Sequence, residues 1–177
     1  PFLEDHQFKT GSLTLRGKTF SGILLNYDIY NQQLLMKFRN KTGADNLIVI
    51  SDAWLENFSL NGMTFEILPL DDTVRRIIQI IGSGTFRIGY MWQKDLEPDS
   101  FHGARYYSFS SPKKEMFIIS ADQMIRYRDN RTFCAALGES KRKVVREYLD
   151  NERIRIRRID DQTMADVMEL INDQVEK

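Results

Sequence analysis

The residues most suggestive of catalysis are Ser140 and Lys143, which match the Ser-x-x-Lys motif of acylating serine enzymes. In that chemistry a lysine activates the serine hydroxyl, and two partner motifs, Ser-Asp-Asn and Lys-Thr-Gly, complete the site. Neither partner motif occurs in this sequence. A serine at this position has a simpler role as the cap of a helix. The motif therefore predicts no acyl transfer.

The remaining groups that could do chemistry are scattered along the chain. The histidines His6 and His102 are isolated, and the single cysteine, Cys134, lies in an apolar stretch that favours a buried, inert thiol. No spacing of His, Cys and carboxylates resembles a zinc site. We therefore predict no metal, no cofactor and no enzymatic activity. The alternative, a hydrolase, requires a pocket that gathers Asp99, His102 and a nucleophile.

Aromatic side chains offer a candidate binding surface in the second half of the β-rich region. Tyr90 and Trp92 share one face of an expected strand, and Tyr106 lies on a neighbouring strand beyond a polar loop, Lys94 to Gly103. Exposed rings beside polar groups can bind a sugar or a peptide. The alternative is that these rings fill the core. The candidate ligand-binding residues are Tyr90, Trp92, Tyr106, His102 and Arg105.

Arginine alternates with isoleucine over Glu152 to Ile159, which favours an extended strand whose arginines face solvent. Lys141 to Arg158 contains eight basic and three acidic residues, a net charge of +5. These charges could be solvated or paired with the acidic segment that follows, or they could form a contact patch for phosphate, nucleic acid or anionic lipid. The candidate interaction residues are Arg153, Arg155, Arg157 and Arg158.

The elements that must position these residues change character near Asp129. Up to Arg128 the apolar residues alternate or form short runs between turn formers, whereas afterwards they recur at spacings of three and four. The sequence thus predicts an α+β fold, in which antiparallel hairpins form one or two sheets and C-terminal helices pack against them. We expect one compact domain over 1–177, with β units at 8–68 and 74–128 and a helical tail at 130–177.

Individual segments give sharper predictions. Leu47 to Ile50 is a continuous apolar run, which predicts a buried strand. Asn61-Gly62 predicts a tight hairpin turn. The residues expected to cap the three helices are Asn130, Ser140, and Asp160 or Asp161.

Composition narrows the classes of function. The chain has 177 residues, 42% of them hydrophobic, and its 25 basic and 25 acidic residues give zero formal net charge. A dedicated nucleic-acid-binding protein would carry a basic excess, so we expect no nucleic-acid partner. No apolar stretch approaches the ~20 residues that a membrane-spanning helix needs. The first residue is Pro1, which is consistent with a removed export signal or with a trimmed chain.

One set of turn and apolar positions fits the pattern of a known family: Arg16 to Gly22, Asn26-Tyr27-Asp28, Tyr30-Asn31, Val49 to Phe58, Phe65, Lys141, Val144, Tyr148-Leu149, Ile154, Ile156 and Met164 to Ile171. On these positions the sequence resembles small uncharacterised proteins exported by Bacteroides-type bacteria. The resemblance covers most of the chain outside 70–115. It implies a signal peptide and a location in the periplasm or cell envelope. It implies no activity and no functional residues.

Together these observations predict a non-enzymatic binding or scaffolding protein of the bacterial cell envelope. Its partner would be a protein, a glycan or a peptide, and it could form a homodimer. Exposed aromatics around Trp92 and Tyr106 would favour a glycan- or peptide-binding module. Burial of those rings would favour a protein-interaction role through the arginines of 153–158.

Overall fold

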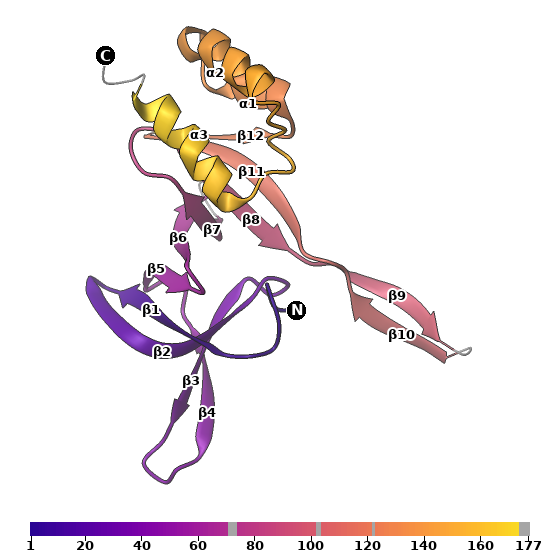
Figure 1. Cartoon of the computed structure of the whole chain (residues 1–177). Coiled ribbons are helices and arrows are strands. Elements are labelled where there is room, and N and C mark those ends of the chain that lie inside the picture. The colour runs from indigo at the N-terminus through magenta and orange to yellow at the C-terminus, as the bar shows by residue number, and fades with distance from the viewer. Residues whose placement is uncertain (71–73, 102–103, 122, 174–177) are drawn as a thin grey trace. The chain divides into compact units, whose positions relative to one another are not determined.

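The computed structural model describes residues 1–70, 74–101, 104–121 and 123–173. They form twelve strands followed by three helices (Figure 1), as the α+β prediction required. By its internal contacts the chain divides into two compact units. Unit 1 contains residues 1–78 and 91–114, and unit 2 contains residues 79–90 and 115–177. No helix in the described part of the chain is both long enough and apolar enough to cross a bilayer.

Unit 1 is built from antiparallel hairpins. The strands are β1 (Lys9–Leu15), β2 (Lys18–Asp28), β3 (Gln33–Arg39), β4 (Asp45–Ile50), β5 (Leu55–Leu60) and β6 (Met63–Pro69), and they lie side by side in the order β6-β5-β1-β2-β3-β4. A separate ribbon pairs β9 (Leu96–Phe101) with β10 (Ala104–Phe109). The polar loop expected over 94–103 is therefore largely a strand.

Two-residue turns set the register of these hairpins. Asn61 and Gly62 both have positive φ angles, 51° and 79°, and connect the paired residues Leu60 and Met63. This is the turn geometry that matches the twist of a hairpin and that Asn-Gly favours. The Asn61-Gly62 prediction is confirmed.

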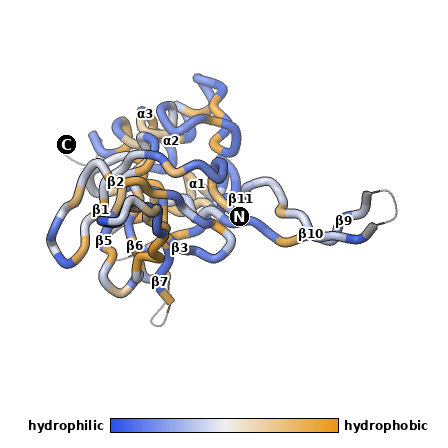
Figure 2. Tube along the Cα trace, turned by 90° about the horizontal axis from the view of Figure 1, so that it is seen from below, coloured by the Kyte–Doolittle hydropathy of each residue, from blue (hydrophilic) through white to orange (hydrophobic). Residues whose placement is uncertain are grey.

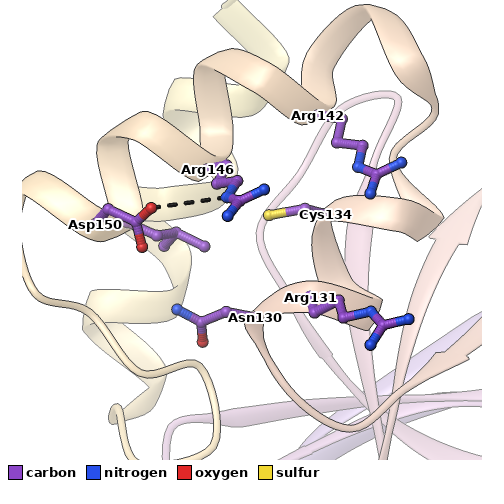
Figure 3. A pocket seen from close by; sticks show the side chains of 7 residues that line it. Asn130, Arg131, Cys134, Arg142, Arg146 and Asp150 are labelled. Carbon is purple, nitrogen blue, oxygen red and sulfur yellow. Dashed lines mark ion pairs between the residues drawn. The ribbon is translucent and has the colours of Figure 1, made fainter.

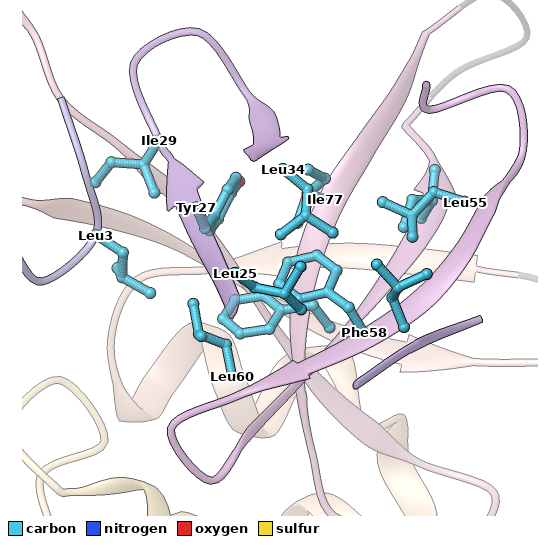
Figure 4. Packing of buried hydrophobic residues seen from close by; sticks show 12 residues of the cluster. Leu3, Leu25, Tyr27, Ile29, Leu34, Leu55, Phe58, Leu60 and Ile77 are labelled. Atoms are coloured by element: carbon cyan, nitrogen blue, oxygen red, sulfur yellow. The ribbon is translucent and has the colours of Figure 1, made fainter. Parts of the chain in front are cut away.

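The core of unit 1 is centred on three rings (Figure 4). Phe58 and Phe65 stack with 4.6 Å between ring centroids, and Tyr27 meets both edge-on at 5.8 and 5.5 Å. All three side chains are buried. The Tyr27 hydroxyl donates a hydrogen bond to Gln32 Oε1 at 2.9 Å, and Gln32 Nε2 donates to the Trp92 carbonyl at 2.8 Å. The side chain of Trp92 is partly buried and packs against this core.

Strand β4 departs from expectation. It forms where Leu47 to Ile50 predicted a strand, but the predicted burial is wrong, because Leu47, Ile48 and Val49 are 63%, 41% and 53% exposed. The reason is its position, since β4 is the last strand in the order and has a neighbour on one side only.

Unit 2 combines strands with all three helices. β7 (Arg75–Ile81) and β8 (Arg87–Gln93) enter it with their residues 79–81 and 87–90, and β11 (Lys113–Ser120) pairs with β12 (Gln123–Tyr127). The strand order is β12-β11-β8-β7. The helices are α1 (Asn130–Ala136), α2 (Glu139–Asn151) and α3 (Asp161–Asp173). Hydropathy along the chain shows α2 as mainly hydrophilic (Figure 2).

Specific contacts connect α3 to the turn between β7 and β8, and α1 to β12. Asn172 Oδ1 accepts a hydrogen bond from the Phe86 backbone N–H at 2.9 Å, and Asn172 Nδ2 donates to the Ser83 carbonyl at 2.7 Å. The rings of Tyr127 and Phe133 meet edge-on at 5.0 Å. The helical period of the last helix predicts one apolar face made of Met164, Val167, Met168, Ile171 and Val175. The first four are buried, and Val175 lies outside the described residues.

The helix caps are only partly as predicted. Asp160 caps α3, because its carboxylate accepts from the Thr163 N–H at 2.8 Å. The cap of α1 is Asp129 and not Asn130, and α2 begins at Glu139 after Gly138, one residue before Ser140.

The strand expected over Glu152 to Ile159 is also wrong, since that segment is a connection made of turns.

Candidate binding site

The described residues of the predicted aromatic site differ in their exposure to solvent. Tyr90 is completely buried, so it presents no ring at a surface, and Trp92 is half-buried with the Lys114 ammonium 5.4 Å from its ring centroid. Tyr106 is exposed on β10, where it pairs with Asp99, whereas its neighbour Arg105 points to the other face of the ribbon. His102 lies outside the described residues.

What the ribbon does present is a different aromatic face. Tyr107 and Phe109, at alternate positions of β10, are opposite Pro98 and Leu96 of β9 and therefore share one face. Tyr107 is 70% exposed, while the Phe109 ring contacts Tyr30 edge-on at 5.1 Å.

The hydrolase alternative gains no support from Asp99. Its carboxylate accepts a hydrogen bond from the Ser100 backbone N–H at 2.7 Å and another from Ser108 Oγ at 3.3 Å on the exposed ribbon. Among the described residues, no group of His, Cys, Asp and Glu is placed to hold a metal ion.

The arginines of the tail, in contrast, surround hollows in unit 2. One hollow of about 300 Å³ lies between α1 and α2 (Figure 3), and a second of about 680 Å³ lies beside it, because Asn130 and Arg131 line both. Six arginines line these two hollows, and we call them the arginine surface: Arg131, Arg142, Arg146, Arg155, Arg157 and Arg158.

A helix end explains why Arg155, Arg157 and Arg158 lie on a loop. Beyond α2 the Ile154 N–H donates to the Leu149 carbonyl at 2.8 Å, and the Arg153 N–H donates to the Asp150 carbonyl at 3.2 Å. Arg153 has a φ angle of 55°. These two bonds and one left-handed residue make a Schellman ending, which turns the chain away from the helix axis. The alternating Arg and Ile that follow lie in turns and irregular backbone and not in a strand.

Asn130 ties this loop to α1. Its Nδ2 donates to the Ile154 carbonyl at 2.7 Å, and its Oδ1 accepts from the Ile156 backbone N–H at 2.9 Å. Ile156 is buried, whereas Arg155 and Arg157 on either side of it are exposed. One amide and one anchoring side chain therefore hold the loop so that its arginines face outward.

The carboxylates that line these hollows neutralise little of the arginine charge. Asp129 caps α1, where its carboxylate accepts from the Thr132 backbone N–H at 2.8 Å, and it interacts with the charge of Arg131 without forming an ion pair. Asp150 lies 3.8 Å from Arg146, and both side chains are well exposed, so this pair is worth little. Within the described part of the chain, the other five guanidinium groups of the arginine surface form no ion pair.

Cys134 completes the smaller hollow without adding reactivity. Its thiol is buried on α1, and this burial raises the pKa of the thiol despite the opposing effect of Arg146 and Arg142. A thiol that stays protonated at neutral pH is a poor nucleophile, which agrees with the inert role expected from the sequence.

The sequence prediction named the arginines of the loop and the basic segment Lys141 to Arg158, which includes Arg142 and Arg146, but it did not include Arg131. Arg131, Arg142 and Arg146 belong to α1 and α2, and Arg153, which was predicted to contact a partner, instead forms the turn. The available signal was the spacing of Arg142 and Arg146, which places both on one face of a helix.

Comparisons with known proteins add no assignment. No protein-family model, no curated protein and no solved structure matches the chain.

Proposed function

We propose that the protein is a non-enzymatic binding protein of the bacterial cell envelope that holds an acidic segment of a partner protein on the arginine surface. The observation that carries the proposal is a set of six arginines around two adjoining hollows, with five guanidinium groups unpaired among the described residues. Guanidinium groups bind carboxylates in a bidentate manner, so they suit recognition of Asp and Glu side chains.

The shape of the surface favours a protein segment over a small ion. The two hollows have about 300 and 680 Å³ and share Asn130 and Arg131, so a ligand that fills both must be extended. Leu149 and Cys134 add apolar lining to the smaller hollow, which a purely ionic ligand would not use. The zero net charge of the whole chain weakens the case for nucleic acid. The proposal includes the packing of the helices on the sheet of unit 2, which would hold this surface rigid.

The test is a titration of the protein with a fluorescent oligoglutamate peptide, followed by anisotropy. The double variant Arg131→Ala/Arg155→Ala should bind about a hundredfold more weakly, since each of the two lost charge-assisted contacts is worth about 1.5 kcal/mol. The matched control is Lys18→Ala/Lys41→Ala, which removes two exposed cations elsewhere and should bind like the parent chain. Equal affinity of both double variants, or preference for duplex DNA over the peptide, would refute the proposal.

Asn130 gives an independent variant of the same experiment. Asn130→Ala removes two hydrogen bonds, of 2.7 and 2.9 Å, that fix the loop, without removing any charge. We expect a loss of about 1–2 kcal/mol of stability together with weaker peptide binding. Asn46→Ala, which removes one exposed hydrogen bond of 3.2 Å, is the control and should leave both unchanged.

A second candidate function is a glycan- or peptide-binding module that uses the β9–β10 ribbon. The supporting observation is the exposed face formed by Tyr107, Phe109 and Leu96, which are 70%, 41% and 42% exposed. Flat apolar rings of this kind stack on sugars and peptides. Tyr107→Ala should abolish binding to an immobilised glycan array, whereas Arg131→Ala should not affect it.

A further inference from the structure

The outer edge of β4 is an unfinished part of unit 1. β4 is the last strand in the sheet order, and three of its side chains, Leu47, Ile48 and Val49, are exposed. The arginine surface belongs to unit 2, so this feature is independent of the proposed function.

Burial decreases step by step toward this edge along one row of the sheet. Leu25 of β2 pairs with Met36 of β3, and Met36 pairs with Ile48 of β4, so the three side chains share one face. Leu25 is fully buried, Met36 is partly buried against the core, and Ile48 is 41% exposed. The core of unit 1 therefore extends to β4 and is open to solvent there.

The opposite face of β4 is also apolar over Leu47 and Val49, although Lys37 of β3 lies beside Leu47 on that face. Leu35 pairs with Val49, and Leu47 follows two residues earlier on the same side of β4. Val49 and Leu47 are 53% and 63% exposed. A strand that is apolar on both faces is typical of the interior of a sheet, where neighbours cover both sides and both edges.

Nothing in β4 protects its edge from pairing. Natural edge strands carry lysine, proline or a bulge that blocks addition of another strand. Residues 46–50 contain no charged residue and no proline, and the pairing of β4 with β3 is regular from Asp45 to Ile50. The one charge, Asp45, is occupied by Lys37 at 2.7 Å.

We propose that β4 pairs with β4 of a second copy of this chain, antiparallel, with Ile48 on the twofold axis. In this register Leu47 lies opposite Val49 of the second copy, Asn46 opposite Ile50, and Asp45 opposite Ser51. Every opposed pair shares a face, as antiparallel pairing requires, and no like charges meet. The rows Leu25–Met36–Ile48 of the two copies join end to end into one continuous apolar row.

The composition of β4 favours a second copy of β4 as the strand that pairs with its open edge. An added strand must be uncharged over several residues and apolar on both faces, because it extends both faces of β4. β4 itself has this composition, and the twofold arrangement satisfies both copies at once, as in most homodimers. Since a single strand pair buries less than the about 1,600 Å² of a standard interface, we expect a weak dimer, of about micromolar dissociation constant.

The first test is sedimentation velocity over a concentration series. Ile48→Lys places two ammonium groups opposite each other on the axis, and it should raise the dissociation constant at least about tenfold. Val144→Lys is the matched control, because Val144 is 43% exposed, close to the 41% of Ile48, but lies on α2. A parent chain that stays monomeric at all concentrations, or an Ile48→Lys variant that dimerises like Val144→Lys, would overturn the proposal.

The second test does not depend on the stability of a charged variant. In a Cys134→Ala background, Ile48→Cys brings the two new thiols together across the axis, within reach of a disulfide. Mild oxidation should then give a covalent dimer for Ile48→Cys and not for Val144→Cys. Equal crosslinking of the two variants, or none for Ile48→Cys, would contradict the twofold register.

Discussion

At the scale of single residues, two aspartates that cap helices make the stability of the protein depend on pH. The carboxylates of Asp129 and Asp160 accept hydrogen bonds from the backbone N–H groups of Thr132 and Thr163, both at 2.8 Å, and these bonds lower the pKa of each carboxyl below its usual value. The folded-state pKa is thus below the unfolded one, so the stabilisation is complete above the unfolded pKa of about 4 and is lost as pH falls through the folded pKa.

We therefore expect Asp129→Asn/Asp160→Asn to unfold with a weaker pH dependence below about pH 4, because asparagine also caps helices but does not titrate there. Urea midpoints measured between neutral and acidic pH would show it. The control is Asp52→Asn, an exposed carboxylate with no hydrogen bond or ion pair among the described residues. A double variant whose curve overlays that of the control would contradict the role of the caps.

The same residues show how far a sequence can specify a cap. A polar residue before an apolar period predicts where a helix begins to within a residue or two, and Asp160 was found in this way. At α1 the prediction fell on Asn130, but Asp129 caps, since its carboxylate and the Thr132 hydroxyl bond each other's backbone N–H. The side chain of Asn130 instead bonds the backbone of the loop that carries Arg155, Arg157 and Arg158. Its partners lie 24 and 26 residues away in the chain, a separation that local sequence does not reveal.

At the scale of elements, the Schellman ending of α2 is testable through Arg153. Its φ angle of 55° is in the left-handed region, which costs a residue with a Cβ about 1 kcal/mol relative to glycine. Arg153→Gly should therefore stabilise the protein by about 0.5–1 kcal/mol in chemical unfolding, and Arg153→Val should destabilise it.

The control for this change is Arg158→Gly on the same loop. Arg158 is not among the residues with positive φ, so glycine there should give no gain and cost a few tenths of a kcal/mol through the freer unfolded chain. Equal effects at positions 153 and 158 would show that loss of charge, not relief of backbone strain, is responsible.

Two segments were predicted with the wrong environment for one physical reason. The hydrophobic period shows which faces of a segment are apolar, but it does not show which other segments pack beside it. The alternating Arg and Ile of 152–159 suit a strand, but α2 ends at a left-handed arginine, where glycine is the usual signal, and no strand of the described chain pairs with this segment. The run Leu47 to Ile50 suits a buried strand, yet β4 has a neighbour on one side only. Burial is decided by long-range pairing, which the sequence alone does not provide.

At the scale of the whole molecule, the division of the chain is not sequential. The sequence suggested β units at 8–68 and 74–128 before a helical tail. In the structure each unit is made of two separate segments of the chain, since 91–114 belongs to unit 1 and 79–90 belongs to unit 2. Three strands, β7, β8 and β11, each contribute residues to both units. Such a division depends on contacts between distant segments, for which turn signals and hydrophobic period carry no information.

The shared strands lead to a prediction about cooperativity. Phe58 of unit 1 and Phe133 of unit 2 are both buried, at 1% and 0% exposure, so truncation of either to alanine should cost about 3–5 kcal/mol. Because unfolding of either unit releases one end of β7, β8 and β11, we expect each variant to weaken hydrogen-exchange protection in both units. Phe20→Ala, at a side chain that is 45% exposed, is the control and should change protection little. If Phe58→Ala weakened only 1–78 and 91–114 while 139–173 kept its protection, the two units would be separate folding domains, and the single domain expected from the sequence would be refuted.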